Sequence, residues 1–267
     1  MLRGARADVP APTSTPARDR HVSTLLLINP NTSTAVTELM AGVMRPLLDE
    51  DVDLVTVTAR FGASYIASET AYAIATHAVL DAWAAFVADG GRCNAICIGC
   101  FGDPGVAALR EAAGVPVMGL AEAALREAAA RGLHGIVTGG AAWRPMLERF
   151  AAANDLQHGL EGIHVVEKSG VELMQQPDGG AAEILGALQA AIGPGTAALV
   201  IGGAALGGIA KQVAPRVPVA VIDSVQAGAR WAAAALSGTD PHAASRDAGV
   251  RWTGLSGELS EVLGRAG

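Results

Sequence analysis

Apolar and polar positions alternate in blocks from about Val22 onward. The apolar run Leu25–Ile28 leads directly into the polar segment Asn29–Ser33. Asn, Pro, Thr and Ser are typical loop and N-cap residues. The pattern therefore predicts a strand that ends in this segment, and a helix that starts there and runs through Thr37 to Leu48.

The same succession of strand and helix continues along the chain. The pattern predicts strands at Asp53–Thr58 and Ala95–Ile98, with an Ala-rich helix over roughly Glu69–Asp89 between them. A glycine-rich turn, Gly99–Gly105, follows the second of these strands, and the next helix begins near it and ends by Gly114. Strands that alternate with helices in this way indicate an α/β fold with a largely parallel sheet.

One strand–turn–helix pattern occurs twice. Each copy contains a Val-Pro-Val segment that precedes an Ala-rich helix, at Val115–Val117 and at Val217–Val219. At nearly the same distance before each segment, an apolar strand ends in a turn, at Ile98–Cys100 in the first copy and at Ile201–Gly203 in the second. All α/β units share such features, so the repeat can be generic. The other interpretation is two pseudo-symmetric lobes that each offer one strand-end loop to a shared cleft, where ligands of such folds bind.

We therefore expect an α/β fold with two pseudo-symmetric lobes, each a mainly parallel sheet flanked by helices, and an active site in the cleft between them. Residues 1–22 are rich in Ala, Pro and Arg and lack the apolar segment of a signal peptide, so we expect a disordered N-terminal tail. Residues 23–118 together with 218–267 are assigned to lobe 1, and residues 119–217 to lobe 2.

Composition limits the classes of partner. The chain has 267 residues, of which 51% are hydrophobic, enough to bury a large core. Its 19 basic and 26 acidic residues give a formal net charge of −7, which argues against nucleic acid and anionic membranes as partners. No apolar run reaches the length that crosses a bilayer, and the three cysteines are too close together for a long-range disulfide framework. We expect a cytoplasmic homo-oligomer with reduced thiols that acts on a small molecule.

The cysteines at positions 93, 97 and 100 have the spacing of an iron–sulfur loop in radical enzymes. Cys97, however, alternates with Ile96 and Ile98 in an apolar strand, so we expect it to pack as a small buried hydrophobe. Cys100 lies past the strand, in a glycine-rich turn that opens a helix. Backbone N–H groups and a helix N-terminus favour anions there and lower the pKa of a thiol. An inert buried cysteine is the alternative, and the local sequence does not choose between the two.

Other residues were considered for the cleft. Thr138 and Gly139 end a predicted strand and could offer a hydroxyl and N–H groups to a substrate oxygen, or form only a turn. Glu122 and Asp223 occupy matching places after the two Val-Pro-Val strands. They could steady the cleft or cap the following helices, and capping is the commoner role. The histidines have no metal spacing, and the glycines of Gly202–Gly208 lack the order of a phosphate-binding motif, so we expect neither a metal nor a cofactor.

Several segments resemble the aspartate/glutamate/hydantoin racemase superfamily, and the hydantoin racemases most of all. They are INPNTS at Ile28–Ser33, CFGDPG at Cys100–Gly105 and VMGLAEAA at Val117–Ala124, and the pair Ser68-Glu69 resembles a Ser-Glu pair of the hydantoin racemases. The resemblance extends from Leu25 to about Ala235. It implies removal of a proton from a carbon flanked by carbonyl groups without a cofactor. In members of that superfamily two cysteines, one from each lobe, face each other across the substrate: one thiolate takes the proton and the other thiol returns it on the opposite face.

The resemblance makes Cys100 the catalytic residue. The substrate-binding residues that we predict with it are Asn31, Thr32, Phe101, Gly102, Thr138, Gly139, Gly203 and Ala204. The second cysteine of the family belongs in the turn at Ile201–Leu206, where this chain has Gly203, and no cysteine follows Cys100. This departure argues against racemisation by two thiols. Arylmalonate decarboxylases, which resemble the same superfamily, also have a single catalytic cysteine, but on the opposite lobe.

We predict an enzyme that acts at an activated carbon of a small hydantoin-like or amino-acid-derived substrate. One possibility is a hydantoin-type racemase that uses Cys100 together with a non-cysteine partner or water. Another is a single-cysteine lyase, either a decarboxylase or a thiohydantoin-desulfurising enzyme. The last is a binding protein on a racemase fold, against which the intact CFGDPG turn argues, because a binder needs no thiol.

Overall fold

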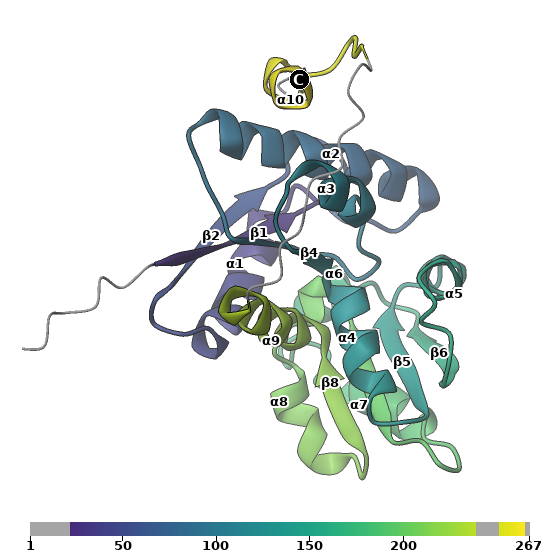
Figure 1. Ribbon diagram of the computed structural model, residues 1–267. Coiled ribbons are helices and arrows are strands. Elements are labelled where there is room, and N and C mark those ends of the chain that lie inside the picture. Colours follow the sequence, from purple (N-terminus) through teal and green to yellow (C-terminus); the bar gives the residue numbers. More distant parts are fainter. Residues whose placement is uncertain (1–21, 239–250, 265–267) are drawn as a thin grey trace, which may run out of the picture.

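The computed structural model describes residues 22–238 and 251–264, so the predicted N-terminal tail lies almost entirely outside the described residues. In these ranges the chain forms two separate four-stranded sheets with the strand orders β2-β1-β3-β4 and β6-β5-β7-β8. Every strand pair is parallel. Helices flank both sheets (Figure 1), which confirms the predicted α/β fold of two mainly parallel sheets.

The first sheet uses the first half of the chain. Its strands are β1 (Ser23–Asn29), β2 (Val52–Thr58), β3 (Ala95–Ile98) and β4 (Val117–Gly119). The helices that connect them are α1 (Thr34–Met44), η1 (Arg45–Leu47), α2 (Glu69–Ala88) and α3 (Val106–Ala112).

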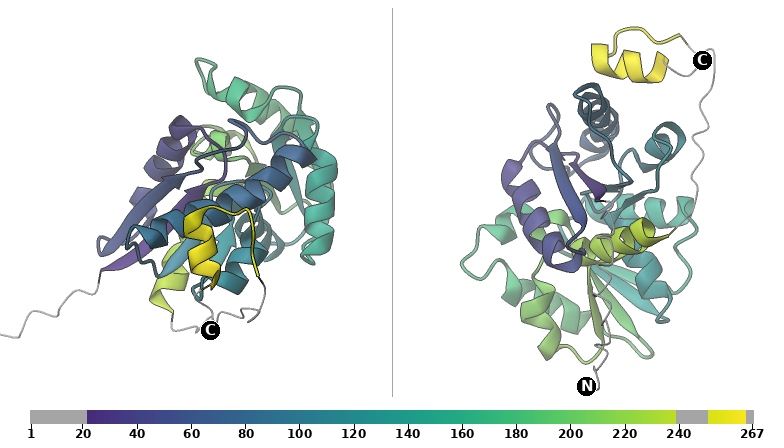
Figure 2. Two further views of the ribbon diagram at one scale, coloured as in Figure 1. Left: turned by 90° about the horizontal axis from the view of Figure 1, so that it is seen from above. Right: turned by 60° about the vertical axis from the view of Figure 1, so that its left-hand side comes forward.

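The second sheet uses the following part of the chain. Its strands are β5 (His134–Gly139), β6 (Leu160–Val166), β7 (Ala198–Gly202) and β8 (Ala220–Asp223). The helices are α4 (Leu120–Ala129), α5 (Trp143–Ala153), α6 (Gly170–Met174), α7 (Ala181–Ala190), η2 (Ala204–Leu206), α8 (Ala210–Val213), η3 (Ala214–Arg216) and α9 (Ser224–Ser237). The last helix, α10 (Gly257–Gly264), returns to the outer side of the first lobe and packs against α2 (Figure 1, Figure 2).

The element boundaries differ from the prediction where proline and capping residues decide them. Helix α1 begins at Thr34, since the side chain of Ser33 accepts a hydrogen bond from the Val36 N–H, and Pro46 lies in the tighter turn η1 rather than in α1. Strand β8 begins after Pro218, at Ala220, because proline cannot donate to a ladder. β8 pairs with β7, so it belongs to the second sheet, whereas the sequence boundary assigned it to lobe 1. The other lobe boundaries stay a prediction.

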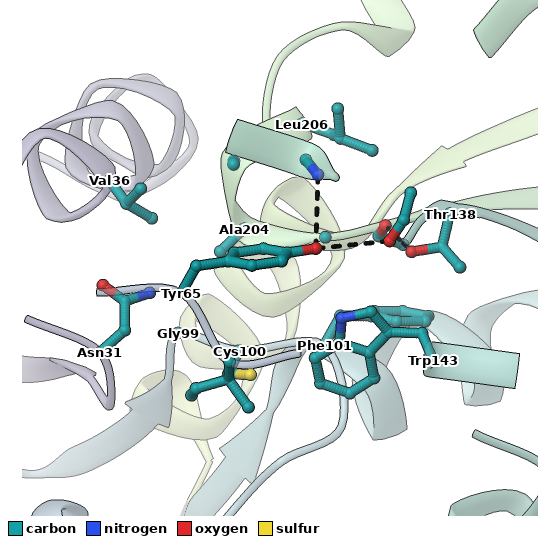
Figure 3. A pocket seen from close by; sticks show the side chains of 16 residues that line it. Asn31, Val36, Tyr65, Gly99, Cys100, Phe101, Thr138, Trp143, Ala204 and Leu206 are labelled. Atoms are coloured by element: carbon teal, nitrogen blue, oxygen red, sulfur yellow. Dashed lines mark hydrogen bonds between the residues drawn. The ribbon is translucent and has the colours of Figure 1, made fainter. Parts of the chain in front are cut away.

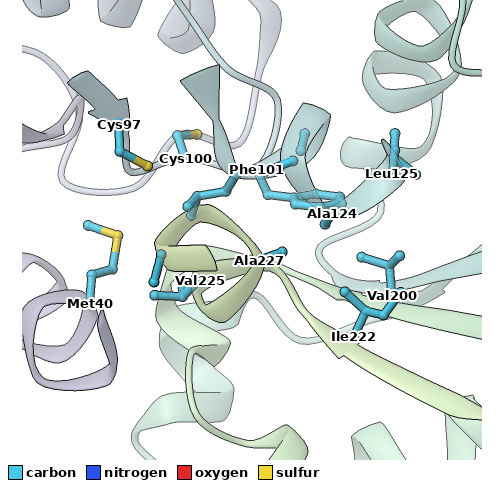
Figure 4. Close-up of a cluster of buried hydrophobic side chains, with 14 of the residues drawn as sticks. Met40, Cys97, Cys100, Phe101, Ala124, Leu125, Val200, Ile222, Val225 and Ala227 are labelled. Atoms are coloured by element: carbon cyan, nitrogen blue, oxygen red, sulfur yellow. The ribbon is translucent and has the colours of Figure 1, made fainter. Parts of the chain in front are cut away.

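The two lobes share a hydrophobic core. Helix α9 contacts strands of both sheets, and one cluster joins Cys97 of β3 to Val200 of β7 and Ile222 of β8 (Figure 4). Cys97 faces this shared cluster, while its neighbours in β3, Ile96 and Ile98, face a separate cluster on the other side of the sheet. Cys97 is fully buried, as expected for a small core residue.

Helix α2 is long and apolar enough, by length and composition alone, to span a membrane, whereas the sequence predicted no apolar segment of that length. Its apolar residues Val79, Ala82 and Trp83 are buried in one cluster with residues of the first sheet and of α10. Its buried Asp81 accepts two hydrogen bonds from Arg60. One such helix is weak evidence, since the core helix of a globular domain has the same composition.

Candidate active site

A cavity lies where the carboxyl ends of the two sheets meet (Figure 3). Four strands that end there, β1, β3, β5 and β7, are each followed by residues that line it, as expected for a ligand site of a parallel α/β fold. The 16 lining residues are Asn31, Val36, Tyr65, Ile66, Gly99, Cys100, Phe101, Thr138, Gly139, Trp143, Gly170, Gly202, Gly203, Ala204, Ala205 and Leu206.

Most of the predicted site residues meet in this cavity. Those that line it are Cys100, Asn31, Phe101, Thr138, Gly139, Gly203 and Ala204. The other two lie behind the lining. Thr32 donates its N–H to the carbonyl of Ala63 at 3.1 Å and so holds the neighbouring loop. The carbonyl of Gly102 accepts a hydrogen bond from the hydroxyl of Tyr72 at 2.8 Å.

Cys100 and Gly203 approach the cavity from different sheets. Cys100 comes two residues after the end of β3, and Gly203 comes directly after β7. The two turns are in direct contact, because the Phe101 ring lies on Gly202: a Cβ at position 202 would be only 2.3 Å from the ring carbon Cε1. Gly203 has a φ of 139°, a backbone conformation that favours glycine, and donates its N–H to Oγ of the buried Ser224 at 3.3 Å. The cavity is therefore lined by a cysteine from the first lobe and by a turn of the second lobe that has no side chain at Gly203.

The thiol of Cys100 is in a less anion-favouring place than the sequence suggested. Cys100 is only 6% exposed, and burial raises the pKa of its thiol, with the nearby Asp103 carboxylate raising it further. The expected lowering of this pKa is wrong, because the thiol is buried and α3 begins only at Val106. At neutral pH the thiol is therefore protonated.

Tyr65 connects the two lobes across the cavity. It belongs to the loop after β2, and its hydroxyl donates to the Gly139 carbonyl at 3.4 Å and accepts from the Gly170 N–H at 3.3 Å. Burial raises the pKa of this phenol, which keeps it protonated. Figure 3 shows Tyr65, Cys100 and Trp143 around the same space. Neither Tyr65 nor Trp143 was predicted from the sequence. Aromatic residues of all kinds make up only 4% of the chain, and this low content is the signal that could have pointed to them.

The polar groups of the cavity are uncharged. Asn31 is fixed because its Oδ1 accepts hydrogen bonds from the Asn29 side chain and the Ser33 N–H. The hydroxyl of Thr138 donates to the Gly202 carbonyl at 2.8 Å and ties the ends of β5 and β7 together. None of the 16 lining residues has a carboxylate, ammonium or guanidinium group. A ligand here meets amides, hydroxyls, a thiol and apolar walls.

The three cysteines do not converge. Cys100 lines the cavity, Cys97 faces the shared core, and Cys93 borders a second cavity beside Trp83. Within residues 22–238 and 251–264, no group of three His, Cys, Asp or Glu side chains is arranged to hold a metal ion. The spacing of the three cysteines therefore reflects one strand and its two ends.

Of the two acidic residues proposed as helix caps, only one is a cap. Asp223 is the N-cap of α9 and accepts from the N–H groups of Val225 and Gln226 at 2.9 and 3.2 Å. Glu122 lies inside the first turn of α4, and its carboxylate pairs with Arg110 and Arg126.

Comparisons with known proteins agree with this geometry. A sequence model of the family described as Asp/Glu/Hydantoin racemase matches residues 25–232. The hydantoin racemase of Paenarthrobacter aurescens is 28% identical over 226 residues, which are 78% of this chain and 89% of that protein. Allantoin racemase from Klebsiella pneumoniae superposes with a TM-score of 0.82 at 24% identity, covering 89% of this chain and 98% of the other. A double mutant of arylmalonate decarboxylase superposes with a TM-score of 0.61 at 20% identity, covering 83% and 97%. At such identities the two structures show a shared fold.

Proposed function

Because the chain belongs to the Asp/Glu/hydantoin racemase family and is thus an enzyme of the racemase class, we propose that it transfers a proton at the activated carbon of a small hydantoin-like ring, with Cys100 as the reactive group and no cofactor. The observation that carries this proposal is the position of Cys100. Cys100 lines the cavity where the two sheets meet, and so does Gly203 from a turn of the other sheet. Membership of this family also argues against a mere binding protein.

The uncharged lining supports a neutral ring as substrate. A free amino acid brings a carboxylate and an ammonium group, and burying such charges without charged partners is costly. A hydantoin ring brings carbonyl and N–H groups, which the amide of Asn31 and the hydroxyls of Thr138 and Tyr65 can match. The apolar side chains of Phe101 and Leu206 suit an apolar substituent on the ring.

The chemistry is expected to be one-sided. The Cys100 thiolate takes the proton from the ring carbon, and the electron pair of the C–H bond moves into the adjacent carbonyl as an enolate. Return of a proton from the same thiol restores the original configuration. Gly203 offers no acid on the other face, so inversion there depends on water or on another group of the cavity.

A single-cysteine lyase is the second candidate. Burial and Asp103 keep the Cys100 thiol protonated, a state that suits donation of a proton to a carbanion. In a decarboxylase, loss of carbon dioxide leaves that carbanion, and the thiol then protonates it from one side. A prochiral disubstituted malonate would yield a single enantiomer of the product by this route.

One experiment tests the proposal. We expect an enantiomerically pure 5-alkylhydantoin in deuterated water to gain one deuterium, seen by mass spectrometry, faster than it loses optical rotation. The variant Cys100→Ser should abolish this exchange. Cys93→Ser is the matched control, since Cys93 lies outside the cavity. Full exchange activity in Cys100→Ser, or no enzyme-dependent exchange in the wild type, would contradict the proposal.

The proposal also includes the cellular location and the oligomeric state of the enzyme. The cytoplasmic location and the homo-oligomeric state stay predictions from the sequence. Light scattering of the purified protein tests the second of them directly.

A further inference from the structure

Asp103 belongs to the Cys100 turn but binds the start of another helix. Its carboxylate is buried, with the residue 5% exposed. The two oxygens accept hydrogen bonds from the backbone N–H groups of Ala121 and Glu122, both at 2.8 Å. These N–H groups belong to the first turn of α4, whose own N-cap residue, Gly119, has no side chain to bind them. Asp103 therefore supplies the missing cap from a distant turn.

The second lobe solves the same problem with a local residue. Asp223, at the end of β8, caps α9 directly, and its other oxygen accepts from the Gly208 N–H in the loop that follows Gly203. The corresponding position in the first lobe is Gly119, at the end of β4. A Cβ at Gly119 would lie 2.1 Å from Cγ of Asp103. The Asp103 carboxyl thus fills the space that a side chain of residue 119 would need.

The backbone around Asp103 is held from several sides. Its φ is 57°, in the left-handed region that non-glycine residues rarely adopt. Its N–H donates to the Cys100 carbonyl at 3.2 Å, and the Tyr72 hydroxyl binds the adjoining Gly102 carbonyl. The turn 100–103 is therefore bound to α4 through Asp103 at one end and carries the reactive cysteine, Cys100, at the other.

From this arrangement we infer that Asp103 is a positioning residue for Cys100. By binding the first turn of α4, its carboxylate fixes the turn 100–103 and with it the place of the thiol in the cavity. The inference rests on the proposed function, in which Cys100 is the reactive group. Asp103 does not line the cavity, so its side chain does not touch a ligand there. Besides the effect of its charge on the pKa of Cys100, it acts through the turn.

Exchanging the two residues separates positioning from capping. In Asp103→Gly combined with Gly119→Asp, glycine suits the φ of 57° and leaves room for the new carboxylate. Position 119 has the extended backbone of an N-cap, with φ −110° and ψ 176°, so the new side chain can cap α4 as Asp223 caps α9. Helix α4 then keeps an N-cap, while the turn 100–103 loses its hydrogen bonds to α4.

The expected results differ for the two roles. Asp103→Gly alone should lower both the melting temperature and kcat. The exchange variant should recover most of the melting temperature while kcat stays reduced about tenfold or more, because small misplacements of a reacting group can cost up to about 100-fold. The alkylation rate of Cys100 by iodoacetamide, followed by peptide mass spectrometry, should also stay changed. Asp223→Ala is the matched control, which removes the corresponding cap without touching the Cys100 turn, and should leave that alkylation rate unchanged.

Recovery of both kcat and melting temperature in the exchange variant would overturn the inference and leave Asp103 as a cap only. If the single variant does not fold, the comparison of the exchange variant with the wild type decides alone. Cys100→Ser is measured in parallel. An active Cys100→Ser enzyme overturns the proposed function, whereas an inactive Cys100→Ser enzyme beside a fully active exchange variant overturns only the role of Asp103.

Discussion

Placing a thiol at position 203 would test whether residues 100 and 203 address opposite faces of one substrate. The variant Gly203→Cys has room for its side chain, since a Cβ there meets Leu206 at 3.5 Å, an ordinary van der Waals distance. The cost lies in the backbone. The φ of 139° and ψ of 128° at Gly203 are adopted almost only by glycine, so the substitution should destabilise the fold by about 1–3 kcal/mol. For a chain of this size the melting temperature should fall by about 2–4 °C per kcal/mol.

The expected gain is on the second face of the substrate. The introduced thiol would stand across the cavity from Cys100, so a proton taken by one could be returned by the other. In deuterated water the wild type should exchange the ring proton faster than it loses optical rotation. In Gly203→Cys the two rates should approach each other. The gain is expected to be partial, because positional tolerance in active sites is below about an ångström.

Gly203→Ala is the matched control, because it introduces the same backbone strain without a thiol. Its ratio of racemisation to exchange should equal that of the wild type, with a similar loss of melting temperature. A folded Gly203→Cys enzyme whose ratio is unchanged would refute the reasoning that residues 100 and 203 address opposite faces of one substrate. An equal rise of the ratio in Gly203→Ala would refute it as well, since water would then be the second acid.

Three other predictions follow from buried groups. Because burial and Asp103 raise the pKa of Cys100, its alkylation by iodoacetamide in the free enzyme should be slow at pH 7 and still rising above about pH 9; a plateau by pH 8 would contradict this. Burial raises the pKa of Asp103 to about 7, above its value in the unfolded chain. The stability that Asp103 adds relative to Asp103→Asn should therefore be fully present below about pH 4 and be lost as the pH rises through 7. Urea unfolding of both proteins measures this difference in stability, and a difference that grows with pH would contradict the prediction. Tyr65→Phe removes the hydroxyl that joins the lobes through its hydrogen bonds with Gly139 and Gly170. It should lower the free energy of unfolding by about 0.5–1.5 kcal/mol and raise KM. An unchanged KM would show that this contact does not shape the cavity.

The repeated parts of the fold could be predicted from the sequence. Apolar runs that end in glycine or Asn-Pro turns marked β1 and β3, and the recurrence of such a turn at Ile201–Gly203 paired it with the Cys100 turn. The reason is geometric: parallel strands bring their carboxyl ends to one edge, so side chains just after two strands meet even when they are far apart in sequence. The neighbours Phe101, Thr138 and Ala204 followed from the same rule.

Contacts between loops had no such periodic signal. Tyr65 lies in the loop after β2 and Trp143 is the first residue of α5, and at neither place does the sequence have a pattern that fixes where the side chain points. The cap of α4 was assigned by analogy to Glu122, because the sequence shows which residues start a helix but not that a carboxylate from Asp103 arrives there from elsewhere. The pKa of Cys100 was misjudged for a related reason: local sequence shows the turn, whereas burial depends on both lobes.

The protonated state of Cys100 bears on which reaction the cavity supports. Proton abstraction needs a thiolate, and a thiol whose pKa lies above its usual range is less ionised at pH 7 than a free cysteine, which is itself only a few per cent thiolate. The rate of hydrogen exchange on a hydantoin should therefore rise with pH throughout the neutral range. Protonation of a carbanion needs the neutral thiol, so the rate of a decarboxylation that ends at Cys100 should stay flat over the same range. Gly203 supplies no second base that could alter this dependence, so the slope of kcat against pH distinguishes the two chemistries. A flat profile for hydantoin exchange would mean that substrate binding itself removes the thiol proton. The protonation state of Cys100 in the free enzyme would then differ from its state during the reaction.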